Sequence, residues 1–198
     1  SLGTGANSGT LMVSHFLKKT DFVLGIGTSF TRSLFNAPVP SGVTLAQSTN
    51  SADELNKDYR IDLGAIGDAK LVLRQMIEEV KRQVGEHGRG DEKGVAKEIA
   101  DVRKSWMEEW GPRLTSDEVP INPYRVITEL EKAVDVSNTI ITHDSGYPRD
   151  QLVPFWKPVR PRGYIGWGKS TQLGYGLGLA MGVKLAAPDK QVINVMGD

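Results

Sequence analysis

Cysteine is absent from the 198-residue chain, which excludes a disulfide framework, thiolate metal ligands and a cysteine nucleophile. The sequence also lacks a signal peptide and any run approaching the roughly 20 apolar residues of a membrane span. Neither sign of charge dominates, because 24 Lys and Arg residues balance 24 Asp and Glu residues. This balance gives no indication of a nucleic-acid or anionic-membrane partner. We therefore expect a globular, cytoplasmic protein that binds neither nucleic acid nor membrane.

The two ends of the sequence look cut. The chain begins at Ser1 without a Met, and it ends with Gly197 and Asp198 directly after the apolar run 192–196. Buried parallel strands read as such runs, and open α/β sheets bind ligands at the carboxyl ends of their strands. A strand that carries a Gly and an Asp to that edge predicts one part of a site. We expect the sequence to be a fragment of a longer protein.

The first 85 residues alternate short apolar runs with amphipathic segments, which predicts an α/β fold with a parallel sheet. Asp68 is placed to cap the start of a helix, and Gly85 is placed to end it. The expected strands are 21–27, 43–46 and 61–66, and the expected helices are 11–19 and 69–84.

The middle of the chain reads as a linker. Residues 86–94 are polar and glycine-rich, and an amphipathic helix is expected to follow until Gly111 and Pro112 end it. Trp106 and Trp110 lie on the apolar stripe of that helix. Two Trp residues in this position are expected to anchor packing.

A new unit begins at Asn122 and Pro123, a good start signal for a helix. A strand is expected at 138–142, a loop from Tyr147 to about Ser170, a buried helix around 174–186 and a last strand at 191–196. That helix holds four glycines, each of which costs about 1 kcal/mol relative to Ala. Close approach of another backbone or of a cofactor is the usual reason for such a cost.

Two strands of this unit end in an acid next to a glycine, at 143–146 and 196–198, and a glycine-rich stretch lies between them at 166–174. Parallel strands bring such ends to one edge of the sheet. Backbone N–H groups at a helix start and in glycine turns suit a diphosphate, and a carboxylate nearby suits Mg²⁺. The pattern predicts a site for a diphosphate-bearing cofactor with a bridging metal.

Several stretches of the sequence resemble a known family. The sequence is similar to the thiamine-diphosphate-binding domain of the acetolactate synthase, pyruvate oxidase and benzoylformate decarboxylase group, and upstream to the central domain of the same enzymes. The matching stretches are Asp144-Ser145-Gly146, residues 171–177, Ala187-Pro188-Asp189 and residues 195–198, with 21–28 and 66–69 for the central domain.

The resemblance implies a role for each matching residue. Gly197 opens the family's metal motif, and Asp198 would be its first Mg²⁺ ligand, or else an ordinary solvated chain end. Leu173 would hold the cofactor in its bent shape. Backbone groups of Thr171, Gln172 and Leu173 would bind the pyrimidine, and Ser145, Gly146 and Tyr147 would lie near the diphosphate. Two roles remain for Asp144, either a contact with the cofactor or a cap on the turn. His143 is expected to be structural or solvent-facing.

The resemblance also implies a domain organisation: a partial Rossmann-like central domain at 1–85, a helical linker at 86–118 and a truncated thiamine-diphosphate-binding domain at 119–198. The parent would decarboxylate or ligate 2-oxo acids as a homodimer or homotetramer. The family's activating Glu lies in another domain, so no catalytic residue is expected here and the fragment alone should be inactive.

Some features depart from the acetolactate synthase pattern. Residues 147–151 replace a polar segment, Leu173 stands where Met is usual and Gly178 where Pro is usual. The parent enzyme could therefore be another decarboxylase or lyase of the group. A rival hypothesis is a nucleotide-binding module of an oxidoreductase or regulatory protein, with its site at the glycine turn 25–27, and a related one places FAD or an adenine nucleotide in the central domain. Neither glycine segment completes the Rossmann fingerprint.

Overall fold

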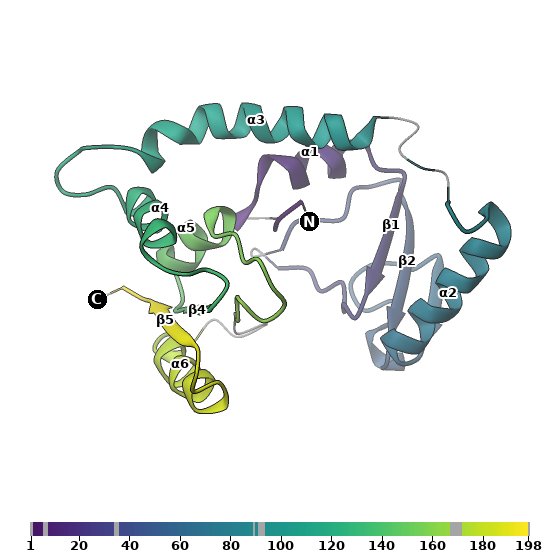
Figure 1. The fold of residues 1–198 in the computed structure, drawn as a ribbon. Helices are drawn as coiled ribbons and strands as arrows, with labels where there is room; N and C mark the ends of the chain where they lie inside the picture. The colour runs from purple at the N-terminus through teal and green to yellow at the C-terminus, as the bar shows by residue number, and fades with distance from the viewer. Residues whose placement is uncertain are drawn as a thin grey trace. The chain divides into compact units, whose positions relative to one another are not determined.

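The computed structural model describes residues 2–5, 8–33, 36–88, 90, 94–166 and 172–197. Its contacts divide the chain into two compact units, a N-terminal unit built from residues 4–104 and a C-terminal unit built from residues 105–198. The division falls inside α3 (Val95–Leu114), which lies within the expected linker (Figure 1). This division into two units does not test the predicted boundaries at residues 85 and 118, which stay a prediction. Of the helices in the described ranges, none has the length and hydropathy needed to cross a membrane.

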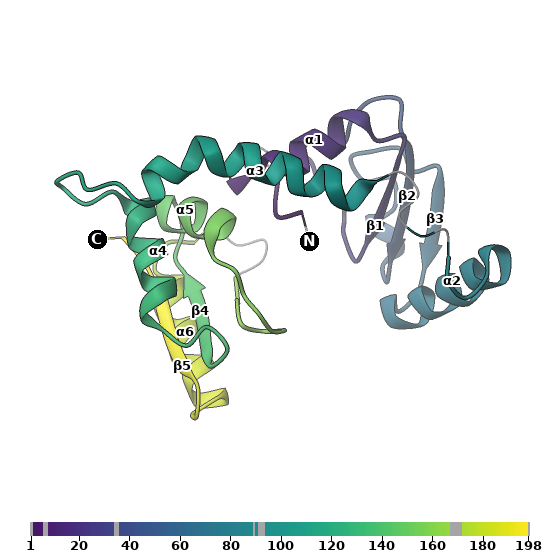
Figure 2. The ribbon, with the colours of Figure 1, turned by 45° about the horizontal axis from the view of Figure 1, so that its top comes forward.

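The N-terminal unit contains a three-stranded parallel sheet in the order β1-β2-β3, which confirms the predicted parallel α/β class (Figure 2). Phe22 pairs with Thr44, and Ala46 pairs with Leu63. The second strand runs further than expected, to Thr49. The elements are α1 (Leu11–Lys19), β1 (Phe22–Ile26), β2 (Thr44–Thr49), the short 3-10 helix η2 (Ala52–Glu54), β3 (Leu63–Ile66) and α2 (Ala69–Val84).

Local signals set the ends of α2 as predicted. The Asp68 carboxylate accepts hydrogen bonds from the N–H groups of Lys70 and Leu71, which satisfies two donors that a helix start leaves free. Gly85 follows the last turn with a φ of 83°, a conformation that a residue with a Cβ adopts at a cost. Each signal acts over three or four residues, which is why the sequence shows it.

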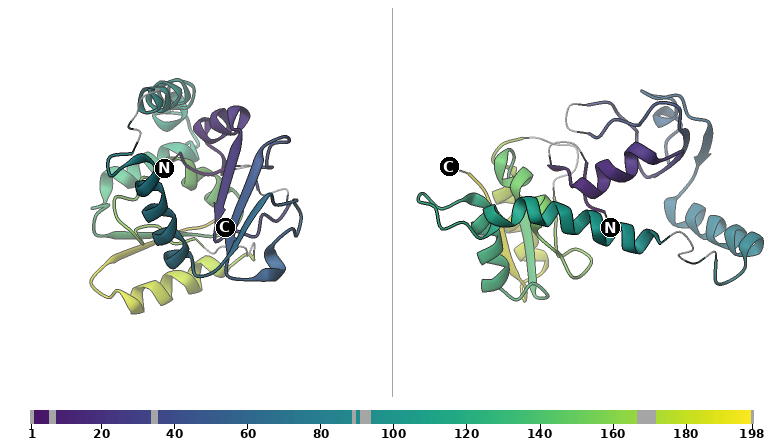
Figure 3. Two further views of the ribbon diagram at one scale, coloured as in Figure 1. Left: turned by 90° about the vertical axis from the view of Figure 1, so that its right-hand side faces the viewer. Right: turned by 90° about the horizontal axis from the view of Figure 1, so that it is seen from above.

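The C-terminal unit is built around two buried parallel strands. β4 and β5 pair from Thr139 with Gln191 to His143 with Val195, and every residue of β4 is buried. Figure 1 shows α6 on one side of this strand pair and α4 and α5 on the other side. The left view of Figure 3 shows the same arrangement from another direction. The elements are α4 (Pro123–Ala133), β4 (Thr139–His143), α5 (Tyr147–Phe155), α6 (Tyr175–Ala186) and β5 (Gln191–Val195).

An aromatic cluster joins α3, α4 and α5. The rings of Trp106 and Phe155 stack with centroids 4.9 Å apart, and Trp110 meets Tyr124 edge-on at 5.0 Å. Offset and edge-to-face pairs of this kind add to the stabilisation that burial itself provides. The prediction that the two Trp residues anchor packing is confirmed.

The expected end of α3 at Gly111 and Pro112 is wrong, because the helix continues to Leu114. Proline lacks an N–H donor and usually breaks a helix interior. Here it lies in the last turn, where Leu114 is buried and the N–H of Thr115 bonds to the carbonyl of Gly111 at 3.2 Å. Burial of Leu114 keeps the final turn helical.

The expected loop from Tyr147 to Ser170 is also wrong at its start, since Tyr147–Phe155 forms α5. Pro148 lies in the first turn, where no N–H donor is needed. Leu152 and Phe155, one turn apart, are both buried. The composition of the segment is typical of a loop, but burial of Leu152 and Phe155 stabilises a short helix instead.

The helix expected around 174–186 forms as α6, but it is not buried all round. Gly176 and Val183 are its buried residues, and Gly176 lies against the strand ends. The opposite side is exposed. The prediction of a buried helix is therefore wrong, since most of α6 is exposed and its exposed side is apolar.

Replacing Phe155 with Ala should destabilise the C-terminal unit by about 3–5 kcal/mol, because the loss of a stacked aromatic ring leaves a cavity. All four Trp residues of the sequence follow residue 104, so Trp fluorescence during urea unfolding reports on this unit. Val119→Ala, at a side chain that is 93% exposed, is the control and should change stability by less than about 0.5 kcal/mol. Equal effects of the two changes would contradict the packing role of the cluster.

Candidate functional site

The ends of β4 and β5 meet at one edge of the parallel pair, as predicted. The N–H of Asp144 donates to the carbonyl of Val195 at 2.9 Å, directly after the last paired residues of β4 and β5. Ser145 and Gly146 follow on one strand, and Gly197 follows on the other. Asp198 and Thr171, two of the predicted site residues, lie outside the described residues.

The Asp144 carboxylate lies at the centre of this edge and is buried. One of its oxygens, Oδ1, accepts from the N–H groups of Ser145 at 2.7 Å and Gly174 at 3.0 Å. The other, Oδ2, accepts from the N–H of Gly176 at 3.0 Å. Asp144 thus caps both its own turn and the start of α6, thirty residues away. The capping role left open by the sequence is confirmed, and a contact with a cofactor remains a prediction.

The geometry at the start of α6 does not suit a diphosphate. Gly174 is the N-cap of α6 and has no side chain of its own to cap the helix. The Asp144 carboxylate takes that place and brings a negative charge to the positive end of the helix. A diphosphate there would displace the carboxylate or repel it.

Hydrogen bonding keeps Asp144 ionised despite its burial. Burial alone would raise the pKa of this carboxyl, but the three N–H donors of Ser145, Gly174 and Gly176 outweigh it and hold the pKa below its usual value. Bonds to an ionised acceptor are stronger than bonds between neutral groups. The carboxylate is therefore a stable structural charge.

The close approach of backbones predicted for the glycine-rich helix occurs at Gly176. A Cβ at this position would lie 2.7 Å from the Oδ1 of Asn194, 2.9 Å from the carbonyl of His143 and 3.0 Å from the N–H of Asp144. No side chain fits in that space. Gly178 and Gly182 are different, because a Cβ at either would meet nothing within 4 Å.

His143 is buried at the end of β4, so its structural role is confirmed and it does not face solvent. Its Nδ1 donates to the carbonyl of Asp144 at 2.9 Å, and its ring stacks on Tyr164 with centroids 5.5 Å apart. Burial lowers the pKa of His143 and raises that of the Tyr164 hydroxyl. Both groups are therefore neutral at pH 7.

The start of α5 is the better place for an anion. Gly146 is its N-cap with a φ of 81° and no side-chain cap. The N–H groups of Arg149 and Asp150 return to the carbonyl of Gly146, at 3.1 and 3.2 Å, while Pro148 has no N–H. The N–H of Tyr147, at the first helical position, is free of any bond within the helix. The positive helix end and this donor suit a phosphate oxygen.

The remaining predicted residues lie nearby on the surface. Leu173 is an exposed apolar residue in the turn before α6, next to Gln172, and Gly197 is exposed after β5. Within the described ranges no group of three acidic or His residues could hold a metal ion. The predicted Mg²⁺ site thus has one named ligand, Asp198, which those ranges do not include.

Two residues at this edge were missed from the sequence. Asn194 accepts a hydrogen bond from the Thr142 hydroxyl at 2.9 Å, and its Nδ2 is buried without a partner among the described residues. Tyr164 forms a bridge with Ile141 and stacks on His143. A polar residue inside the apolar run 192–196 was the available signal for Asn194. Nothing local marked Tyr164.

The glycine turn 25–27, the site of the rival nucleotide hypothesis, is covered by an aromatic ring. Phe30 has a positive φ of 47° and its ring lies so close to Gly25 that a Cβ there would clash with it. The ring of Tyr59 packs edge-on against the ring of Phe30, with centroids 6.5 Å apart. The backbone at Gly25 is therefore not open to a pyrophosphate in this structure, whereas a Cβ at Gly27 would meet nothing within 4 Å.

Replacing Asp144 with Asn should lower the free energy of unfolding of the C-terminal unit by about 2 kcal/mol at pH 7, because an amide cannot accept all three N–H bonds. It should also change the response to acid. The pKa of Asp144 is lower in the folded chain than its unfolded value of about 3.9, so its stabilisation is complete above that pH and is lost as pH falls through the folded-state pKa.

The burial of His143 causes an earlier loss, which begins as pH falls below about 6.5, where the unfolded histidine binds a proton. Urea unfolding between pH 7 and 2.5 should show both losses in the parent chain. In Asp144→Asn the loss below pH 4 should be smaller but not absent, because the pKa values of Glu129, Asp135 and Asp189 in the same unit are also lowered. An unchanged loss below pH 4 in this variant would contradict the role given to Asp144.

Gly176→Ala should destabilise the C-terminal unit by about 1–3 kcal/mol, since the strand ends must move to admit a methyl group. Gly178→Ala, two residues along the same helix, is the matched control and should stabilise the chain by up to about 1 kcal/mol. Thermal unfolding of the two variants compares them directly. A similar sign for both would show that Gly176 is not in close contact.

Comparison with known proteins identifies the C-terminal part of the chain. Residues 144–198 match the family described as "Thiamine pyrophosphate enzyme, C-terminal TPP binding domain". A "Probable acetolactate synthase large subunit" of Methanococcus aeolicus is 28% identical over 207 residues, which cover 100% of this chain and 34% of the relative.

Two further relatives match the whole chain at lower identity. The "Acetolactate synthase isozyme 3 large subunit" of Escherichia coli (strain K12) is 24% identical over 206 residues, and the "3D-(3,5/4)-trihydroxycyclohexane-1,2-dione hydrolase" of Shouchella clausii is 24% identical over 218 residues. All of this chain and 34% of each relative are covered, so the chain spans about a third of their length. The predicted resemblance is confirmed: residues 144–198 match the C-terminal cofactor-binding domain of the thiamine pyrophosphate enzymes.

Proposed function

We propose that this chain is part of an enzyme that uses thiamine diphosphate and Mg²⁺ to decarboxylate or ligate 2-oxo acids. The observation that carries the proposal is the match of residues 144–198 to the cofactor-binding domain, at the edge where the two strand ends meet. In the same proposal the N-terminal unit is part of a Rossmann-like central domain. The proposal gives the substrate only as a class, the 2-oxo acids.

The residues at this edge fit the cofactor in part. The start of α5, with Gly146 and the N–H of Tyr147, suits the diphosphate, and Ser145 lies beside it. Leu173 is an apolar side chain that the chain itself leaves exposed, which suits contact with the body of the cofactor. Backbone groups of Gln172 and Thr171 would complete that contact, and Asp198 after Gly197 would hold Mg²⁺.

Asp144 contributes indirectly in this proposal. Its oxygens are engaged by backbone donors, so it holds the turn at Ser145 and the start of α6 in fixed positions on either side of the site. When bound, thiamine diphosphate supplies the chemistry that stabilises the negative charge left as a 2-oxo acid loses CO₂. The chain's own part is to bind and orient the cofactor.

The whole enzyme needs more than this chain. The relatives are about three times as long, and no residue of the present sequence is assigned a catalytic role. We therefore propose that the 198-residue chain alone has no turnover and that the longer protein assembles as a homodimer or homotetramer. The departures at 147–151, Leu173 and Gly178 favour a decarboxylase or lyase of the group as much as an acetolactate synthase.

The rival function, a nucleotide-binding module centred on the turn 25–27, has less support. The ring of Phe30 lies against Gly25, where a pyrophosphate would need to approach the backbone. A nucleotide whose pyrophosphate lay against Gly25 would require Phe30 to move.

The test uses a longer protein, made by extending the coding sequence on both sides of this chain. We expect CO₂ release from pyruvate that needs both thiamine diphosphate and Mg²⁺, and none from the 198-residue chain. Asp198→Ala should lower the activity at least about 100-fold, since a metal ligand is lost. Asp189→Ala changes an exposed acid in the turn before β5 and is the matched control.

Two results would count against the proposal. Activity that survives Asp198→Ala at every Mg²⁺ concentration would remove the metal role. Calorimetric binding of FAD or ATP to the chain, unaffected by Asp198→Ala and without any response to thiamine diphosphate in the longer protein, would favour the nucleotide module instead.

A further inference from the structure

Two consecutive residues at the end of β4 reach the two ends of the glycine-rich stretch 166–174. The Asp144 carboxylate accepts from the N–H of Gly174 at 3.0 Å, at the far end of the stretch. The ring of His143 lies against Gly166 at the near end, since a Cβ on this glycine would lie 3.3 Å from the Nε2 atom. One strand end therefore contacts both flanks of the same stretch.

The hydrogen bond of the His143 ring fixes where its proton lies. A carbonyl oxygen can only accept, so the bond of 2.9 Å between Nδ1 and the carbonyl of Asp144 places the proton of the neutral ring on Nδ1. The Nε2 atom then carries a lone pair, on the side of the ring that faces Gly166. Tyr164 stacks on the same ring with centroids 5.5 Å apart. The neutral ring thus turns an uncharged acceptor toward the glycine.

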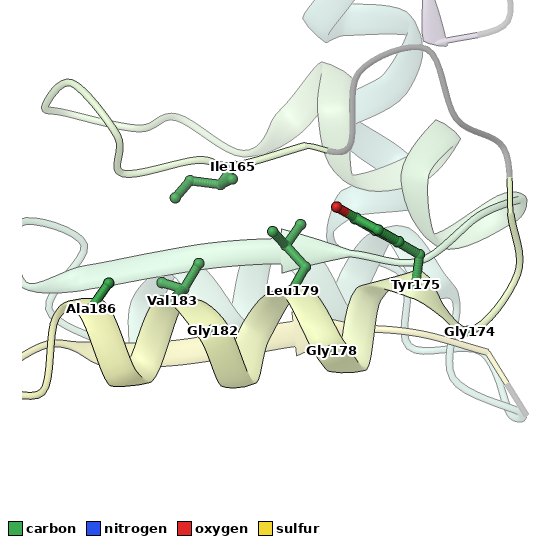
Figure 4. A pocket seen from close by; sticks show the side chains of 8 residues that line it. All are labelled: Ile165, Gly174, Tyr175, Gly178, Leu179, Gly182, Val183 and Ala186. Atoms are coloured by element: carbon green, nitrogen blue, oxygen red, sulfur yellow. The ribbon is translucent and has the colours of Figure 1, made fainter.

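The segment that leads to this glycine, residues 163–165, is supported from the side of β4. The N–H of Ile141 donates to the carbonyl of Gly163, and the N–H of Ile165 donates to the carbonyl of Ile141, both at 3.0 Å. On the side of α6, Ile165 borders a hollow of about 700 Å³ (Figure 4). Support from β4, including the ring of His143 at its end, therefore determines where the segment lies.

A second proton on the ring would disrupt this arrangement. Protonation adds an N–H group and a positive charge at Nε2, and His143 is only 3% exposed. Burial opposes the charged form, which lowers the pKa of His143. Water reaches the new N–H group only when Gly166 moves away from the ring. Acid therefore favours a form in which the contact between His143 and Gly166 is broken.

Four titratable groups among the described residues act on the ring: Asp144, Arg149, Asp150 and Tyr164. The two carboxylates favour the protonated ring, and the guanidinium of α5 opposes it. The tyrosine is neutral, because burial raises the pKa of its hydroxyl. β5 and α6 bring the uncharged residues Val195 and Gly176 against this end of β4. Burial is the largest of these influences, so the ring is neutral at pH 7.

The stretch whose ends are fixed in this way contains Gln172 and Leu173, which the proposed function places against the cofactor. We propose that neutral His143 is a positioning residue for the cofactor: it holds the Gly166 end of the stretch while Asp144 holds the other end, and its protonation releases the first. This inference rests on the proposed function and adds to it a residue that acts through the stretch. It predicts that affinity for the cofactor follows the protonation of one buried histidine.

Nitrogen-15 NMR of the histidine rings in the 198-residue chain tests the state of the ring directly. The sequence contains three His residues, so one single-residue variant assigns each signal. We expect His143 to carry its proton on Nδ1 at pH 7 and to be mostly neutral at pH 6, whereas an unperturbed histidine is half protonated near about pH 6.5. A proton on Nε2 instead, or a ring that is already charged at pH 7, would overturn the proposal.

Calorimetric binding of thiamine diphosphate to the longer protein, at saturating Mg²⁺, tests the contact itself. His143→Ala and Gly166→Ala should each raise the Kd at least about tenfold, the first by removing the ring and the second by pushing a methyl group against it. In the double variant the methyl group enters the space left by the ring, so the two losses should not add. His87→Ala, at an exposed histidine, and Gly111→Ala, where a Cβ meets nothing within 4 Å, are the matched controls and should change the Kd less than about twofold.

The dependence of the Kd on pH separates positioning from a purely structural role. His143→Gln keeps an uncharged polar group at about the reach of Nε2 and does not titrate, so it should bind the cofactor about as well as the parent at pH 7.5. Between pH 7.5 and 5, the Kd of the parent should rise at least about fivefold more than that of His143→Gln, since binding requires the neutral ring. Titration of the diphosphate itself is common to both proteins and cancels in this comparison.

Three results would overturn the inference, and they separate it from the proposed function. A longer protein that binds thiamine diphosphate equally well with His143→Ala and His87→Ala would remove the positioning role and leave the proposed function intact. Additive losses in the double variant, or parallel pH profiles of the parent and His143→Gln, would do the same. A longer protein that does not bind thiamine diphosphate at all would overturn the proposed function and this inference with it.

Discussion

The buried carboxylate of Asp144 is the constraint on which the C-terminal unit depends. A charge in this position is stable only because three backbone N–H groups converge on it, from Ser145 on its own turn and from Gly174 and Gly176 at the start of α6. These bonds join two segments that are thirty residues apart. The position of α6 on the strands follows from them.

That constraint has consequences on both sides of α6. On the inner side, the helix start comes so near the strand ends that only glycine fits at position 176. On the outer side, Leu177, Met181 and Leu185 are left exposed, because a helix fixed by its first turn presents its remaining faces according to its own periodicity. The carboxylate also neutralises the positive end of α6, which leaves the start of α5 as the place for an anion.

Much of the fold could be predicted because its signals are local. The cap at Asp68, the stop at Gly85 and the start at Asn122 and Pro123 each act within a few residues, and all were found as predicted. Strands such as β4 were recognised by their apolar runs. Predictions failed where a local rule met distant packing. Pro112 stays inside α3 because Leu114 is buried, and 147–155 forms a helix because Leu152 and Phe155 fill the aromatic core.

The sequence by itself determined the α/β class, the meeting of the ends of β4 and β5 and the resemblance to the thiamine-diphosphate enzymes. It did not distinguish Gly176 from Gly178, which are two residues apart and look alike, nor a ligand role for Asp144 from a capping role. Only the tertiary structure decided these, since close contact at Gly176 and the donors on Asp144 come from segments far away in the chain. The physical reason is that backbone propensities act over a few residues, whereas burial and non-local hydrogen bonds exist only once the chain has closed on itself.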